Sequence, residues 1–345
     1  MPWTHVCADQ RDWEALALEK GLRSLSYVEA LREAQAQLLA SDPAVFILGE
    51  GVDDPGGAFG STLGLADRFG KARVRDLPIA EAGMTGVALG AALVGMRPVF
   101  VHMRTDFLPV CMDQIVNHAA KWRYMTGGKQ GAPLVIRAII GRGWGSAAQH
   151  SQALQSLFLP VPGLKIAVPA TPYDAKGLLV AAVRGEDPVL FIEHRWLYGS
   201  VGYVPEEPYE VPFGRAVVRR AGTDVTVVAF SLMVLEAARA ARILAGEGVS
   251  CEVVDPRTLN PLDMETILES VAKTGRLVVC DCACRSGGAG AEIAARLAEA
   301  RPGLLRAPLR RVTFPDAPTP ASPVLEAAYY PGAAEIAAAA REILP

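Results

Sequence analysis

The stretch RDLPIAEAGMTGVALGAALVGM, residues 75–96, organises the rest of the chain. Proline disfavours a helical conformation in the residue before it, so a helix is predicted to begin only after Pro78, close to Glu81. Glycine costs about 0.5–1 kcal/mol in a helix relative to alanine, so repeated glycines there predict a face against which a second backbone packs closely. These glycines are Gly83, Gly86, Gly90 and Gly95.

Glu81 is a lone acid between Ile79 and this apolar helix, and we expect it to be desolvated. One interpretation is that its charge only complements the positive N-terminal end of the helix. The other is that it is a functional carboxyl group, because burial raises the pKa of a carboxyl group and lets it exchange a proton with a partner.

Composition limits the classes of protein that the chain can belong to. A length of 345 residues allows two domains with full cores. The net charge of −3, with no basic cluster, argues against a nucleic-acid partner. The apolar run 82–96 is shorter than the roughly 20 residues that span a bilayer, and the first 23 residues lack the apolar core of a signal peptide. We therefore expect no membrane partner and a cytoplasmic location.

The pattern of short apolar runs and amphipathic segments predicts an α/β fold. Ser26 precedes an amphipathic helix over 26–39 with Glu29 at the capping-box spacing. The run 134–140 is almost wholly apolar, which is typical of a central strand in a parallel sheet. Other predicted strands are 45–48, 99–102, 165–168 and 189–193, and a helix is predicted over 111–122.

The second half alternates strands (225–229, 251–254, 277–280) with helices (233–246, 263–273, 289–300). Strands separated by helices of this length predict parallel sheets covered by helices on both faces. We predict two such domains, at 24–200 and 215–345, joined by a linker at 201–214 and preceded by an N-terminal extension at 1–23.

Two further polar residues follow predicted strands, where ligands gather in open α/β sheets. Glu50 lies in Gly49-Glu50-Gly51, and His150 lies in a polar, glycine-rich loop. A turn residue and a structural histidine are the simpler interpretations. The alternating Cys280, Cys282 and Cys284 are interpreted as buried free thiols, with a soft-metal or redox site as the alternative.

Several motifs together resemble one family. They are IAEAG (79–83) with its Gly/Ala helix, GMRPV (95–99), DFx5DQI (106–115), QHSQ (149–152) and VDPRTLxPLD (254–263). The chain from about Leu25 to Leu344 is similar to the β subunits of thiamine-diphosphate-dependent 2-oxoacid dehydrogenases, the decarboxylating components of the pyruvate and branched-chain complexes in the transketolase superfamily. The resemblance implies a pyrimidine-binding domain at 24–200 and a transketolase C-terminal-like domain at 215–345.

The resemblance also implies roles for residues. Glu81 would hydrogen-bond a pyrimidine nitrogen of the cofactor, and Glu50 would lie near it and share a proton relay. Ile79 and Phe107 would contact the cofactor, with the Phe107 ring stacked on the aminopyrimidine. His150 would act in proton transfer, or in orienting the lipoyl group or the substrate carboxylate.

The Gly-Asp-Gly motif that holds magnesium and diphosphate in this superfamily is absent from the sequence. The resemblance therefore implies an obligate α subunit, in an α2β2 assembly, that supplies this half of the site. It also implies a lipoyl acyltransferase as acceptor, and a structural potassium ion held by backbone oxygens at Leu134, Ala182, Val183, Gly185 and Asp187.

Some positions depart from the family pattern. Arg104-Thr105 replaces a more aromatic stretch, and Arg104 is expected to be a spare cation that meets a sugar phosphate or a carboxylate. One alternative function is therefore a transketolase-like enzyme that moves a two-carbon unit from a ketose phosphate or 2-oxoacid to a carrier-protein thiol. The other is a non-catalytic structural subunit.

Overall fold

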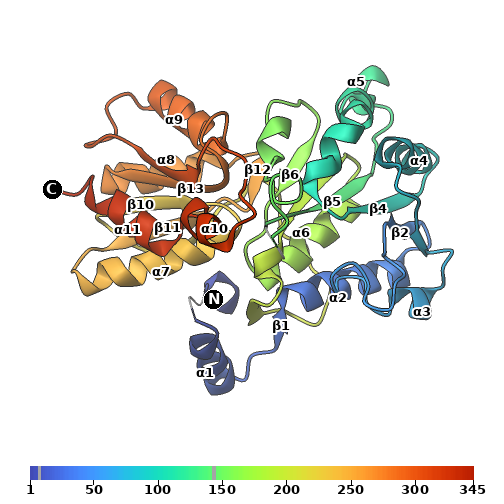
Figure 1. The fold of residues 1–345 in the computed structure, drawn as a ribbon, viewed down its shortest axis with the longest axis horizontal. Helices are drawn as coiled ribbons and strands as arrows, with labels where there is room; N and C mark the ends of the chain where they lie inside the picture. The colour runs from blue at the N-terminus through green and yellow to red at the C-terminus, as the bar shows by residue number, and fades with distance from the viewer. Residues whose placement is uncertain (7–8, 142–144) are drawn as a thin grey trace.

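The computed structural model describes residues 1–6, 9–141 and 145–345, which form two sheet-containing units side by side (Figure 1). The sheet of the first unit has seven strands in the order β12-β6-β7-β5-β4-β2-β3. Their bounds are β2 Val45–Gly49, β3 Val74–Asp76, β4 Arg97–His102, β5 Val135–Ile140, β6 Lys165–Ala167, β7 Val189–His194 and β12 Thr258–Asn260. The predicted parallel sheet is confirmed, except that β12 runs antiparallel to β6 at one edge.

The sheet of the second unit has five strands in the order β14-β13-β10-β11-β9. Their bounds are β9 Val217–Arg220, β10 Val225–Ala229, β11 Cys251–Asp255, β13 Leu277–Cys284 and β14 Arg310–Phe314. This sheet is also parallel except for one edge strand, β9, which is antiparallel to β11. The two antiparallel strands, β9 and β12, were missed in the sequence because they are only four and three residues long.

Helices cover both faces of each sheet, as predicted (Figure 1). In the first unit α2 and α6 pack together on one face, and α4 packs on β4. In the second unit α7 packs with α11, and α8 packs with α9. The bounds are α2 Tyr27–Ser41, α3 Leu65–Phe69, α4 Glu81–Leu93, α5 Trp122–Met125, α6 Pro172–Arg184, α7 Leu232–Gly246, α8 Met264–Thr274, α9 Ala289–Ala300, α10 Pro323–Tyr329 and α11 Ala333–Arg341.

Local signals in the sequence placed several helix starts correctly. The capping box of Ser26 and Glu29 is present at the start of α2. The predicted helix over 111–122 is wrong in form, because the segment is a 3-10 helix η2 (Thr105–Cys111), a π-helix η3 (Asp113–Ala119) and the short α5. Pro109 lies inside η2 and has no N–H to donate, so a regular α-helix does not extend through it.

The N-terminal residues contact both units. After the 3-10 helix η1 (Pro2–Thr4) comes α1 (Gln10–Lys20), whose Trp13 is buried and donates from Nε1 to Ser24 Oγ at 2.9 Å. Strand β1 (Ser24–Ser26) pairs antiparallel with β8 (Val201–Tyr203), so the predicted linker begins with a strand. The remaining 3-10 helices are η4 (Gln155–Phe158) and η5 (Arg195–Leu197).

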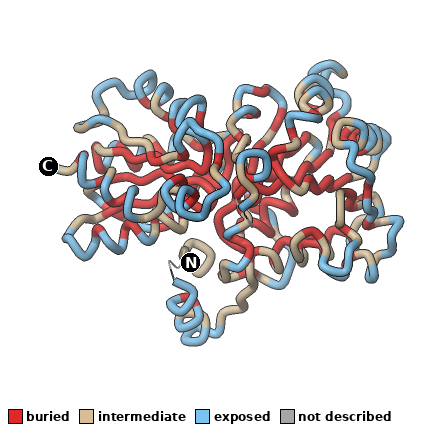
Figure 2. Tube along the Cα trace, viewed as in Figure 1, coloured by how far each residue is buried: buried red, intermediate tan, exposed pale blue. Residues whose placement is uncertain are grey.

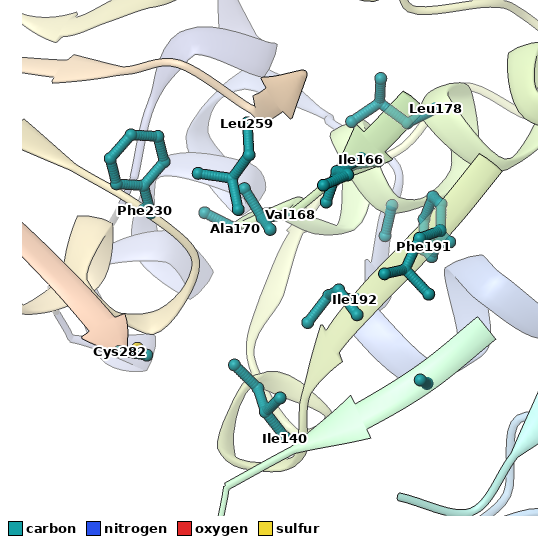
Figure 3. Packing of buried hydrophobic residues seen from close by; sticks show 14 of the residues in the cluster. Ile140, Ile166, Val168, Ala170, Leu178, Phe191, Ile192, Phe230, Leu259 and Cys282 are labelled. Atoms are coloured by element: carbon teal, nitrogen blue, oxygen red, sulfur yellow. The ribbon is translucent and has the colours of Figure 1, made fainter. Parts of the chain in front are cut away.

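The two units share a continuous apolar core, and buried residues fill the interior of both (Figure 2). Strand β12 belongs by sequence to the second half of the chain but completes the sheet of the first. Its Leu259 lies near Val168 and Ala170 at the junction, with Phe230 of the second unit close by (Figure 3). The packing therefore fixes the two units relative to each other.

Four buried charged residues also cross the junction, and we call Asp174, Arg219, Asp255 and Arg257 the junction cluster. Arg219 forms ion pairs with Asp174 and with Asp255, the latter at 2.7 Å, and all three side chains are at most 1% exposed. Arg257 lies 3.3 Å from Asp174. Because α6 supplies Asp174 and the second unit supplies the other three residues, the cluster joins the two units.

No helix within the described ranges 1–6, 9–141 and 145–345 is long and apolar enough to cross a membrane.

Candidate active site

Four of the predicted site residues lie just beyond the carboxyl ends of the parallel strands of the first sheet. We call this side of the sheet, as distinct from its outermost strands, the carboxyl edge of the sheet. Glu50 directly follows β2, and Glu81 is the first residue of α4, which follows β3. Phe107 lies in η2 after β4, and His150 lies in the loop after β5. Parallel strands bring their carboxyl ends to one edge of a sheet, so residues distant in sequence meet there.

The two acids lie close together. Both are half-buried, and the pKa of Glu50 is raised, first by burial and then by the nearby Glu81 and Asp76 carboxylates. The raised pKa makes Glu50 a carboxyl group that holds a proton more readily than an ordinary glutamate. Glycine is required before it, since a Cβ at Gly49 would collide with the carbonyl oxygen of Val101.

The predicted desolvation of Glu81 is not present in the single chain. Ile79 beside it is 80% exposed, and Glu81 keeps partial contact with solvent. Val87 on the helix that it begins and Val94 directly after this helix are exposed, and a Cβ at Gly83 or Gly90 on the same helix would meet nothing within 4 Å. The close packing that the glycines predict is therefore not provided by the described part of this chain.

Phe107 and His150 form the second half of the site. Their rings lie edge to face with centroids 5.4 Å apart, a favoured aromatic geometry. Phe107 is half-buried, whereas His150 is exposed. The structure thus brings together the two rings that the sequence placed 43 positions apart (150 minus 107).

A buried polar layer behind α4 was missed in the sequence. His102 ends β4, and its Nε2 lies 3.4 Å from Thr85 Oγ1, one turn after Glu81. Burial lowers the pKa of His102 to about 4, so the ring is neutral near pH 7. The sequence shows a histidine at the end of an apolar strand, which could have marked His102 as a candidate residue. Only the tertiary structure shows that His102 faces α4.

Arg104 is not the spare cation that the sequence suggested. Its side chain is buried, its Nη1 donates to the carbonyl oxygen of Gly141 at 2.8 Å, and its Nη2 lies 3.5 Å from Ser146 Oγ. Burial lowers the pKa of this guanidinium. Arg104 therefore braces the start of the loop that follows β5.

The positions expected to hold potassium do not form a free carbonyl cage. The Val183 and Gly185 carbonyl oxygens accept hydrogen bonds from Arg97 Nη1 at 2.9 and 2.8 Å. Leu134 O accepts from Val189 N at 2.9 Å, Ala182 O accepts from Gly185 N at 3.3 Å, and the Asp187 carboxylate pairs with Arg123 and Lys165. The Arg97 guanidinium binds two of these five carbonyl oxygens, and its positive charge opposes a potassium ion at the same place.

Two of the three alternating cysteines are buried as predicted, and the prediction is wrong for Cys284. Cys280 and Cys282 are buried free thiols, and Cys284 is exposed at the end of β13. Burial raises the pKa of Cys280. Within the part of the chain that the structure describes, no group of three or more His, Cys, Asp or Glu side chains could hold a metal ion.

The edge residues fit one half of a ring-shaped cofactor. Two neighbouring carboxyl groups can share a proton with a ring nitrogen, and an aromatic face with an exposed apolar residue can pack on the ring. These groups are Glu50, Glu81, Phe107 and Ile79. The sequence contains no Gly-Asp-Gly motif for a diphosphate and its cation.

Comparison with known proteins identifies the two domains of the chain. Residues 23–200 match the family model described as "Transketolase, pyrimidine binding domain", and residues 214–336 match "Transketolase, C-terminal domain". A solved structure described as "Split gene transketolase, inactive beta4 tetramer" superposes with a TM-score of 0.75 at 26% identity, covering 93% of this chain and 98% of that one. The fold and site therefore define a transketolase-type chain.

Curated relatives narrow the class. The acetoin:2,6-dichlorophenolindophenol oxidoreductase subunit β of Cupriavidus necator is 49% identical, over 93% of this chain and 98% of its own length. The 2-oxoisovalerate dehydrogenase subunit β of Bacillus subtilis is 42% identical, over 92% and 98%. The pyruvate dehydrogenase E1 component subunit β of Rickettsia bellii is 42% identical, over 91% and 97%. The chain belongs to the β subunits of the thiamine-diphosphate-dependent 2-oxoacid dehydrogenase family.

Proposed function

We propose that this chain is the β subunit of an enzyme that decarboxylates a 2-oxoacid and passes the acyl unit to a lipoyl group on a partner acyltransferase. The observation that carries the proposal is the meeting of Glu50, Glu81, Phe107 and His150 at one sheet edge, in a chain that aligns with such subunits along most of its length.

Bound thiamine diphosphate would supply the nucleophile that attacks the 2-oxo carbon, and it would accept the electron pair of the carbon–carbon bond that breaks when carbon dioxide leaves. Glu81 would hold a proton at a pyrimidine nitrogen, and Glu50, whose pKa is raised, would exchange protons with it. Phe107 and Ile79 would pack against the ring. The exposed His150 would move a proton, or orient the incoming lipoyl group, on the open side of the site.

The proposal includes an α subunit that completes the site with magnesium and the diphosphate-binding residues, in an α2β2 assembly. Support comes from the exposed face of α4 and from Ile79, whose 80% exposure next to Glu81 would end when a second chain covers it. Covering this face would also desolvate Glu81, as its proposed role requires. Potassium is not part of the proposal, because Arg97 donates to the Val183 and Gly185 carbonyls.

A second candidate donor is acetoin. Two relatives, from Cupriavidus necator and Bacillus subtilis at 49% and 43% identity, are named as acetoin oxidoreductase subunits. Acetoin has no carboxylate, so cleavage would release no carbon dioxide. The relatives favour either donor over a transketolase-like transfer to a carrier-protein thiol and over a purely structural subunit.

The test is co-expression with an α-type partner, followed by a donor screen with thiamine diphosphate, magnesium and an artificial electron acceptor. Pyruvate, branched-chain 2-oxoacids, acetoin and a ketose phosphate are the donors. Acceptor reduction with carbon dioxide release from a 2-oxoacid is the expected result, and reduction with acetoin alone would favour the second candidate. Turnover of the ketose phosphate alone, or none from an assembled complex that binds cofactor, would contradict both.

A further inference from the structure

The loop that carries His150 is tied to the turn that carries Phe107 through one residue, Gln152. Asp106 Oδ1 accepts hydrogen bonds from Gln152 N at 3.0 Å and from Gln152 Nε2 at 3.1 Å. Thr105 Oγ1 donates to Gln152 O at 2.8 Å. Both main-chain polar groups and the side-chain amide of Gln152 are therefore held by two consecutive residues of η2.

This tie is buried although the ring that it serves is exposed. Thr105 is 0% exposed and Asp106 is 9% exposed, whereas His150 lies in an exposed stretch of the loop. Asp106 Oδ2 is buried with no hydrogen-bond partner among the described residues. Burial raises the pKa of Asp106, and the hydrogen bonds from Gln152 oppose that shift. Burial of a carboxyl group costs stability unless its oxygens accept hydrogen bonds, so the two hydrogen bonds from Gln152 stabilise Asp106 in this position.

The tie acts close to both rings. Asp106 directly precedes Phe107, and Gln152 is two residues beyond His150. Among the described residues Phe107 is the one aromatic ring in contact with His150, with centroids 5.4 Å apart. An exposed side chain on a loop has few contacts of its own, so its position depends on how the adjacent backbone is held.

We propose that Asp106, together with Thr105, is a positioning residue that fixes the His150 ring against Phe107 by holding Gln152. The inference rests on the proposed function, because it assigns to His150 a geometry that matters for turnover. Catalysis depends on such positioning, and a displacement of about 1 Å can cost about 100-fold in rate.

The first test measures the tie without using activity. Amide hydrogen exchange of the assembled complex would be followed by mass spectrometry in peptides that cover 148–158. In Asp106→Ala the Gln152 amide loses its acceptor, and we expect its exchange to accelerate at least about tenfold. Asp106→Asn keeps an acceptor oxygen and should stay near wild type, as should the exchange of β5 in every variant.

The matched control is Asp113→Ala, seven positions further along. Asp113 is exposed and accepts from its own helix, from Asn117 Nδ2 at 2.8 Å. Its removal should leave exchange at 148–158 unchanged. If Asp106→Ala does not fold, Thr105→Val keeps the side-chain shape, removes only the donor to Gln152 O, and should accelerate exchange by about threefold. Unchanged exchange at 148–158 in the folded Asp106 or Thr105 variant would overturn the tie.

The second test is a double-mutant cycle on turnover. Asp106→Ala should lower kcat by about 10- to 100-fold with little change in KM for the donor. His150→Ala should lower it at least as much, and the double variant should match His150→Ala because Asp106 acts through that ring. Asp106→Asn should restore most of the rate. If the loss of kcat in the double variant equals the product of the two single losses, Asp106 does not act through His150 and the positioning role is wrong.

The two proposals fail in different ways. A wild-type complex that turns over no donor contradicts the proposed function, yet the exchange experiment still reports whether Asp106 holds Gln152. An active wild-type complex with multiplicative losses in the cycle contradicts only the positioning role.

Discussion

Two groups of charged residues in this chain contrast sharply. In the junction cluster two aspartates meet two arginines, and the Asp174, Arg219 and Asp255 side chains are at most 1% exposed. At the edge of the first sheet Glu50 and Glu81 are both acidic, both half-buried, and close enough for Glu81 to raise the pKa of Glu50. Among the described residues, no salt bridge to either of these two acids is found.

The difference between the two groups is whether the chain itself supplies a partner for each charge. Charges buried within one chain must be paired, because an unpaired buried charge is costly. Two neighbouring carboxyl groups at a partly solvated edge are tolerated because water still hydrates them. In the proposed function they become a proton-exchange site when a partner chain and a cofactor cover them. The junction cluster thus joins the two units of one chain, whereas we propose that the Glu50–Glu81 edge is half of an active site.

The largest expected effect comes from neutralising the open edge. Glu81→Gln keeps the shape of the side chain but removes the exchangeable proton, so turnover of the assembled complex should fall by about 10²- to 10⁴-fold. Assembly and the melting temperature should not change. Steady-state rates and size-exclusion profiles provide the measurement. Glu19→Gln, on the exposed face of α1, is the control, and activity retained in Glu81→Gln would refute the proton role.

Breaking the closed cluster should affect stability instead. Arg219→Met leaves Asp174 and Asp255 buried without their main cation, which should lower the free energy of unfolding by about 3–5 kcal/mol. Equilibrium denaturation measures the loss. The control is Arg341→Met, which breaks an exposed pair with Glu247 and should change little. Equal losses in the two variants would mean that burial does not distinguish these pairs.

Asp281 is a third case beside the junction cluster and the Glu50–Glu81 edge. It is buried, and none of the ion pairs among the described residues includes it. Burial raises its pKa from 3.8 to about 6, although it accepts from Ala283 N at 3.2 Å and Gln155 Nε2 at 3.4 Å. The folded state therefore binds the proton more tightly than the unfolded state. The stabilisation of the folded state by the protonated Asp281 carboxyl group is fully present below about pH 4, and it is lost as the pH rises through about 6.

Asp281→Asn removes this dependence. The stability of the variant relative to wild type should rise between about pH 4 and pH 7, by roughly 3 kcal/mol at 1.36 kcal/mol per pKa unit. Urea denaturation at several pH values gives the difference, which is independent of any constant cost of the substitution. A flat difference across this range would show that Asp281 titrates alike in the folded and unfolded states.

The smallest effect concerns the carbonyl oxygens that Arg97 occupies. Replacing sodium by potassium at constant ionic strength should leave the melting temperature unchanged within error, because Arg97 Nη1 already donates to Val183 O and Gly185 O. Thermal denaturation in the two salts is sufficient. Stabilisation specific to potassium would mean that Arg97 yields its place to the ion.

Local signals in the sequence were sufficient where one segment decides its own structure. The capping box before α2 and the apolar run of β5 lie where they were predicted. The predicted helix over 111–122 is instead a π-helix over Asp113–Ala119 that lies against α4, and no local signal in the sequence distinguishes this form from an α-helix. The edge strands β9 and β12 are too short to carry a periodic pattern.

The candidate site also combines features that the sequence showed with contacts that only the tertiary structure showed. The motifs that resemble the family marked Glu81, Phe107 and His150 in the sequence, and the structure places each of them after a strand end or at a helix start. Nothing in the sequence showed that Gln152 bonds to Asp106, that Arg97 points at the Val183 carbonyl, or that His102 faces Thr85. Each of these contacts joins segments that are 17 or more positions apart.

The sequence by itself determined the α/β alternation, the helix start at Glu81 and the absence of a diphosphate motif, because these depend on neighbouring residues alone. Only the tertiary structure decided which charges are paired and which stay open. Parallel sheets bring distant strand ends to one edge, and burial then sets whether a charge there must be neutralised within the chain. The junction cluster is closed and the Glu50–Glu81 edge is open for that reason.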